Sequence, residues 1–162
     1  MWSSKKIKLI YDFYENDIAY AYAYDGFNQE TKIYNFDYNK ILLDSIKDIS
    51  YDKNRKLIIY SWGILRHAEP ICEISFDLTK FTTKTDIKDI KLFDGRDDEI
   101  QNSIIHHPLF TELLKKIIRE IETNNSTKIS FFCNHGKHRS VGWTEIFKKY
   151  YYTNSIIKHS IE

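Results

Sequence analysis

The sequence has few residues of the kinds that mark linkers, disulfide frameworks or membrane spans. Its 162 residues include only 5 glycines, 2 prolines and 2 cysteines. This composition argues against a disordered chain, and two cysteines far apart in the sequence, Cys72 and Cys133, do not by themselves indicate a disulfide framework. The amino terminus reaches Asp12 and Glu15 before any long apolar stretch. We therefore expect neither a signal peptide nor a membrane span, and we predict a cytoplasmic protein.

An excess of charge of one sign is also missing. Lysine and arginine total 24 against 23 aspartates and glutamates, which gives a net charge of +1. The protein therefore lacks the overall positive field of a dedicated nucleic-acid binder, although a local basic patch is still compatible with these numbers. With 42% hydrophobic and 15% aromatic residues, the chain has the composition of one globular domain with its own core.

The first third of the chain has the alternating pattern of antiparallel strands. The segment DIAYAYAY alternates alanine with tyrosine, and Asp25-Gly26 supplies a turn signal after it. We predict a β-meander closed by a short helix within residues 1–55. Its strands would span residues 6–13, 17–24 and 31–38, and its helix residues 39–49.

The remaining chain has the pattern of an α/β domain. The apolar runs RKLIIYSWG, ICEISFDL and KISFFC predict three buried strands. Helices are predicted over residues 97–122, with a break at His107-Pro108, and over residues 141–151. One apolar stripe predicts the core-facing side of the helix after that break: Phe110, Leu113, Leu114, Ile117, Ile118 and Ile121. The predicted fold is a small α/β sandwich over residues 56–152, with a mixed sheet and flanking helices, preceded by the β-meander within one domain.

The polar loop in CNHGKHRSV, between a predicted strand and a predicted helix, has the chemistry of an anion site. Backbone N–H groups at such a junction point outward, and the positive end of the helix dipole lies behind them. Lys137, His138 and Arg139 add positive or donor groups, Gly136 permits close backbone approach, and Ser140 supplies a hydroxyl. The simpler alternative is a polar loop whose charges are only solvated.

Two chemical alternatives use Cys133. Together with Arg139 it satisfies the C-x5-R spacing of cysteine-dependent phosphatases, with Asp94 or Asp97 as candidate general acids. The bulky residues Asn134, His135 and His138 inside the loop argue against this assignment. The other alternative, zinc held by Cys133, His135 and His138, does not match the usual ligand spacings. We therefore predict no metal and no cofactor.

The loop and its surroundings resemble the carboxy-terminal domain of RapZ proteins. That family has a strand, then Cys-Thr-Gly-Gly-x-His-Arg-Ser-Val, then a helix that soon carries a glutamate. The matching residues here are Cys133, Gly136, His138, Arg139, Ser140, Val141 and Glu145. Further matches lie at Ser61, Trp62, Gly63, Arg66, Pro70, Phe76, Asp77, Gly95, Asp97 and His107-Pro108. The resemblance covers about residues 56–152, but His135 replaces a glycine and Thr79 replaces an arginine.

The resemblance implies a domain that recognises a phosphorylated ligand. RapZ proteins sense glucosamine-6-phosphate through this domain, which also takes part in binding a small RNA and is not known as a phosphatase. Cys133 then becomes a wall of the binding pocket. The residues expected to bind or surround the ligand are Asn134, Gly136, Lys137, His138, Arg139, Ser140, Asp77, Ser61, Gly63 and Arg66.

Two hypotheses about function therefore stand. The first is a binding module for a phosphorylated small molecule, a nucleotide or RNA, in which the meander is a candidate lid or dimer surface of a homo-oligomer. The second is a phosphatase or phosphodiesterase that uses Cys133, His135 or His138 as catalytic residues.

Overall fold

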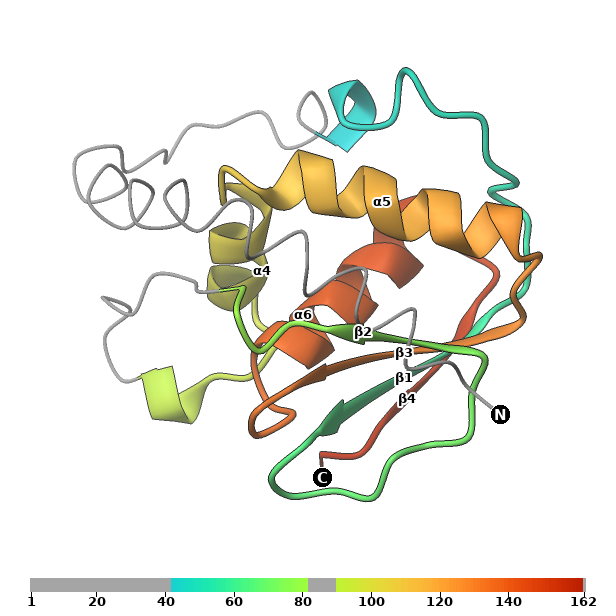
Figure 1. Ribbon diagram of the computed structural model, residues 1–162. Helices are drawn as coiled ribbons and strands as arrows, with labels where there is room; N and C mark the ends of the chain where they lie inside the picture. Colours follow the sequence, from blue (N-terminus) through green and yellow to red (C-terminus); the bar gives the residue numbers. More distant parts are fainter. Residues whose placement is uncertain (1–41, 82–89, 162) are drawn as a thin grey trace.

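The computed structural model describes residues 42–81 and 90–161 (Figure 1). Its elements in chain order are β1 (Ile58–Gly63), β2 (Ile74–Asp77), η1 (Ile90–Leu92), α4 (Asp98–Ile105), α5 (Phe110–Thr123), β3 (Lys128–Cys133), α6 (Arg139–Ile146), η2 (Phe147–Tyr151) and β4 (Ile156–His159). The predicted meander strands, residues 6–13, 17–24 and 31–38, lie outside the described residues. Of the short helix predicted over residues 39–49, the described part is helical only at residues 42–44.

The four described strands form one parallel sheet in the order β2-β3-β1-β4. In its register Gly63 pairs with Cys133, and Ser61 pairs with both Phe131 and His159. The prediction of a mixed sheet is therefore wrong for this part of the chain. Each connection between successive strands is a crossover that returns the chain to the same end of the sheet, so no antiparallel hairpin forms here.

This strand order creates a switch point between β1 and β3. From β1 the chain continues to β2, on the far side of β3, whereas from β3 it continues to β4, on the far side of β1. The two connections therefore leave neighbouring strand ends in opposite directions. In open parallel sheets, ligands bind beside the carboxyl ends of the strands at such a point.

The helices gather on one side of the sheet (Figure 1). Alternate strand residues such as Ile59, Phe76 and Phe131 belong to the core that the helices share. Trp62 and Phe132 are buried outside that core, with their ring centroids 4.7 Å apart. Residues of opposite parity on a strand point to opposite faces. The main core therefore lies between the sheet and the helices α4, α5 and α6.

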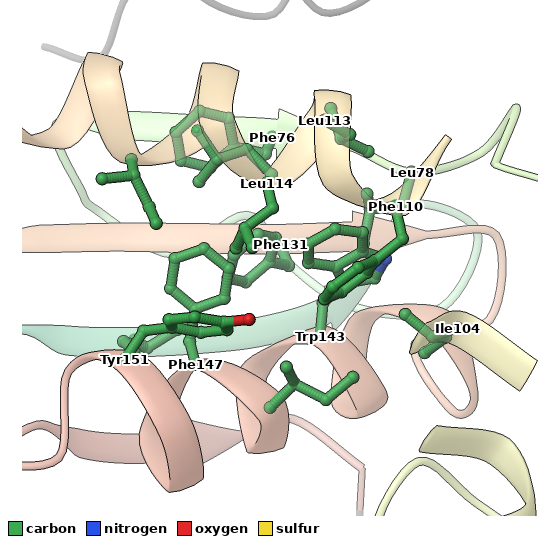
Figure 2. Close-up of a cluster of buried hydrophobic side chains, with 14 of the residues drawn as sticks. Phe76, Leu78, Ile104, Phe110, Leu113, Leu114, Phe131, Trp143, Phe147 and Tyr151 are labelled. Atoms are coloured by element: carbon green, nitrogen blue, oxygen red, sulfur yellow. The ribbon is translucent and has the colours of Figure 1, made fainter. Parts of the chain in front are cut away.

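The centre of this core is a set of aromatic rings around β3 and α6 (Figure 2). The ring of Phe131 lies 5.1 Å from that of Phe147 and 6.1 Å from that of Trp143, and Phe110 of α5 packs 5.1 Å from Trp143. The stripe predicted on α5 is confirmed, because all six of its residues are buried: Phe110, Leu113, Leu114, Ile117, Ile118 and Ile121. These contacts hold β3 and α6 together on both sides of the polar loop.

One predicted helix break is confirmed, one helix start needs correction, and one strand was not predicted. The helix break at His107-Pro108 is present, because α4 ends at Ile105 and α5 begins at Phe110. The last predicted helix begins two residues earlier than expected, at Arg139, and changes to a π-helical turn, η2, at Phe147. The sequence interpretation missed β4, a four-residue edge strand whose side chains are exposed or half-buried.

Removing a core side chain between α5 and the sheet should weaken the whole domain. We expect Leu114→Ala to lower the free energy of unfolding by about 2–5 kcal/mol, because Leu114 is 0% exposed and the substitution leaves a cavity. The matched control Leu92→Ala removes a side chain that is 81% exposed, and it should change stability by less than about 0.5 kcal/mol. Urea unfolding followed by tryptophan fluorescence measures both; equal losses would contradict the assigned core.

Candidate functional site

The loop of residues 134–138 leaves β3 at the carboxyl edge of the sheet and enters α6. Gly142 donates the first helical hydrogen bond of α6 to the His138 carbonyl, at 2.8 Å. Within the described part of the chain, no backbone N–H of residues 134–137 or of residues 139–141 donates a hydrogen bond. These N–H groups lie at the positive end of the α6 dipole, so the loop offers a series of donors to an anion.

The loop is held against the end of β1 by a backbone contact. Gly136 has φ +69°, in the left-handed region that favours glycine. A Cβ atom on Gly63 would lie 2.3 Å from the His135 carbonyl carbon, and one on Gly136 would lie 2.5 Å from the Gly63 nitrogen. Beyond the strand ends, Ile64 and Leu65 continue the pairing by donating to the carbonyls of Cys133 and Asn134 at 2.9 and 3.0 Å. The end of β1 therefore fixes the course of the loop.

A second segment, residues 91–97, supports the loop from the side of α4. The Gly95 N–H donates to the Lys137 carbonyl at 2.8 Å. The side chains of Lys137 and His138 donate to the carbonyls of Lys91 and Phe93, the latter at 2.8 Å. Part of the donor capacity of these two side chains is therefore used to hold the segment against the loop.

The carboxylates of this segment are engaged within their own turn. The Arg96 guanidinium donates to both oxygens of Asp94 and holds the pKa of that carboxyl below its usual value. Asp97 accepts from the Asp94 N–H at 2.8 Å. The two predicted general acids are therefore an ionised, paired carboxylate and a turn-stabilising carboxylate.

Arg139 is fixed beside the loop by the chain after β2. One terminal nitrogen, Nη1, donates to the carbonyls of Leu78 and Thr79 at 3.0 and 2.7 Å. Its Nε and its second terminal nitrogen make no hydrogen bond within the described residues. Asp77 stabilises the same turn, because its Oδ1 accepts from the Thr79 N–H and hydroxyl at 2.8 and 2.6 Å. Arg139 therefore retains donors for a ligand while its orientation is set by the protein.

Comparison with known proteins assigns the chain to a family. A family model described as the RapZ C-terminal domain matches residues 55–161, which is more than half of the chain. The chain belongs to this family. A search of curated proteins found no match. The predicted resemblance is thus confirmed, and the match extends past the predicted boundary at residue 152 to include β4.

Ser61, a predicted ligand residue, has its hydroxyl engaged elsewhere in this RapZ C-terminal domain. It is fully buried, and its Oγ lies 2.6 Å from Nδ1 of His159. His159 Nε2 in turn lies 2.8 Å from a carboxylate oxygen of Glu145 on α6. This chain of hydrogen bonds ties β1 and β4 to α6. Sequence reasoning missed His159, because the only signal for it was the short strand β4.

Cys133 lies inside the core and not on the surface of the loop. It is 3% exposed, and its thiol donates to the Ser140 hydroxyl at 3.3 Å. Ser140 is itself fully buried, and its side chain does not cap α6. The Ser140 hydroxyl accepts the hydrogen bond from Cys133 behind the loop.

Arg66 and His135 bring two connections together. Arg66 follows β1 and donates from Nε to Nδ1 of His135 at 3.1 Å, and both side chains are exposed. The structure therefore brings most of the predicted site residues to one edge of the sheet: the loop, Gly63, Arg66 and the turn that contains Asp77. Ser61 is the exception, because it is buried and is connected to α6 through His159 and Glu145.

Neither metal chemistry nor a membrane span has support in the described residues. No group of three or more histidine, cysteine, aspartate or glutamate side chains is arranged there to hold a metal ion. None of the helices found in that part of the chain has the length and apolar character needed to cross a bilayer.

Adding one methyl group at the contact between β1 and the loop should disturb both. We expect Gly63→Ala to lower the free energy of unfolding by about 1–3 kcal/mol, because backbone atoms of His135 and Gly136 occupy the space that a Cβ needs. Ala68→Ser adds one atom at an exposed position of the same connection and should be neutral within about 0.5 kcal/mol. Urea unfolding compares the two variants, and a neutral Gly63→Ala would show that the close contact does not exist in solution.

Proposed function

We propose that this RapZ C-terminal domain is a binding module that holds the phosphate group of a phosphorylated small molecule or nucleotide in the loop after β3. The observation that carries the proposal is a run of backbone N–H groups at the start of α6, in residues 134–137 and 139–141, that have no hydrogen-bond acceptor among the described residues. A phosphate group offers several acceptor oxygens and negative charge, which complement these donors and the helix dipole.

Arg139 supplies the strongest side-chain donor to the same group. Its Nε and second terminal nitrogen, which have no acceptor in the described part of the chain, can donate to phosphate oxygens, and these charge-assisted bonds are stronger than bonds between neutral groups. The bonds from Nη1 to the chain after β2 fix the guanidinium before any ligand arrives. Binding therefore costs little side-chain entropy at Arg139.

The surroundings of Cys133 favour binding over phosphatase chemistry. A cysteine nucleophile must present its thiolate to the phosphorus atom. The Cys133 thiol is instead buried and donates to Ser140. In the proposed site Cys133 forms the end of β3 behind the loop, and the loop N–H groups and Arg139 hold the ligand. Binding of RNA stays a prediction from the resemblance, and assembly into a homo-oligomer stays a prediction from the meander.

The proposal predicts that phosphate-containing ligands depend on Arg139. We expect Arg139→Ala to weaken binding of phenyl phosphate about tenfold to a hundredfold, from the loss of about 1.5–3 kcal/mol of charge-assisted hydrogen bonding. Arg119→Ala, which removes an exposed arginine on α5, is the matched control and should bind like wild type. Titration calorimetry measures each affinity, and thermal unfolding without ligand identifies any loss of stability in the variant.

Two further measurements separate binding from catalysis. Wild type should release no phosphate from phenyl phosphate, and Cys133→Ser should keep the wild-type affinity. Turnover that disappears in Cys133→Ser would establish the phosphatase and overturn the binding module. Equal affinity in Arg139→Ala and wild type would overturn the site itself.

A further inference from the structure

Three side chains form a cluster where the connection after β1 meets the loop after β3. They are Arg66 and His67 from the first and His135 from the second, and we refer to them as the seam cluster. Arg66 and His135 are exposed, and His67 is half-buried. The cluster lies at the switch point of the sheet, and Gly136, the residue after His135, belongs to the proposed phosphate loop.

Both imidazoles of the seam cluster are held in one neutral tautomer. His67 Nδ1 accepts from the Gly63 N–H at 2.8 Å, and His135 Nδ1 accepts from the Arg66 Nε–H at 3.1 Å. The direction of both hydrogen bonds is fixed, because an amide N–H and a guanidinium N–H can donate a hydrogen bond but cannot accept one. In each neutral ring the proton must then lie on Nε2, so both rings present a donor there.

The remaining polar groups of the cluster are all donors. The two terminal nitrogens of Arg66 and the Nε2 atoms of His67 and His135 have no hydrogen-bond partner within the described chain. Nor does Arg66 form an ion pair with a described carboxylate. The cluster therefore offers hydrogen-bond donors and positive charge, and it offers no acceptor. A second phosphoryl group is complementary to it, because its negatively charged oxygens are all acceptors.

We propose that the seam cluster binds a second phosphoryl group, linked directly to the one in the loop, so that the ligand of this domain carries a diphosphate. This inference rests on the proposed phosphate site. The position of His135 supports direct linkage, because this residue contributes its side chain to the cluster and its backbone N–H to the run of donors in the loop. The second phosphoryl group is then held by Arg66 and His135, with His67 on the β1 side.

The test compares two ligands that cannot be hydrolysed, methylenediphosphonate and methylphosphonate, by titration calorimetry on the full chain. Wild type should bind the diphosphonate at least about tenfold more tightly, which corresponds to one charge-assisted interaction. Arg66→Ala should reduce this preference severalfold and should keep methylphosphonate affinity within about twofold of wild type. His135→Gly should reduce the preference by a similar factor. Arg119→Ala should keep the full preference.

Each outcome has one meaning. If wild type binds both phosphonates equally, or if Arg66→Ala and His135→Gly keep the preference, the diphosphate inference is wrong while the phosphate site stands. If Arg66→Ala loses affinity for both phosphonates equally, Arg66 serves the first phosphoryl group and the inference is again overturned. If wild type binds neither phosphonate, the proposed phosphate site fails, and the diphosphate inference fails with it.

Discussion

The contact between Gly63 and the loop after β3 is the constraint on which the arrangement of the site depends. Backbone lies directly against backbone there, closely enough that a Cβ atom on either Gly63 or Gly136 would overlap the other segment. The left-handed φ of Gly136 turns the loop at this point. Because the loop cannot relax toward β1, its N–H groups stay without partners in the described chain, and a ligand can use them.

The core supplies the rigidity that this contact needs. Phe131 on β3 packs against Trp143 on α6 and Phe147 on η2, so the strand before the loop and the helix after it are joined through the core. The bonds among Ser61, His159 and Glu145 tie the same helix to β1 and β4. An anion site made of backbone N–H groups works best when its supporting elements are held in this way, since little reorganisation accompanies binding.

The sequence predicted those features that depend on local pattern. The apolar stripe on α5, the break before Phe110 and the strand-loop-helix around Cys133 follow from residue spacing alone, and the motif residues led to the correct family. It did not predict features that depend on contacts between distant segments. The parallel direction of the strands follows from the crossover connections between them. Strand β4 pairs only with the edge of β1, and the hydrogen-bond partner of Ser61, His159, lies on β4.

The central claim, that the loop binds phosphate through its backbone, is tested most directly by amide NMR during a titration with inorganic phosphate. The account predicts saturable downfield shifts that are concentrated at the amide protons of residues 134–137 and 139–141, with small changes on α5. Shifts spread evenly over lysine-rich surfaces, or saturable shifts at another edge of the sheet, would contradict it.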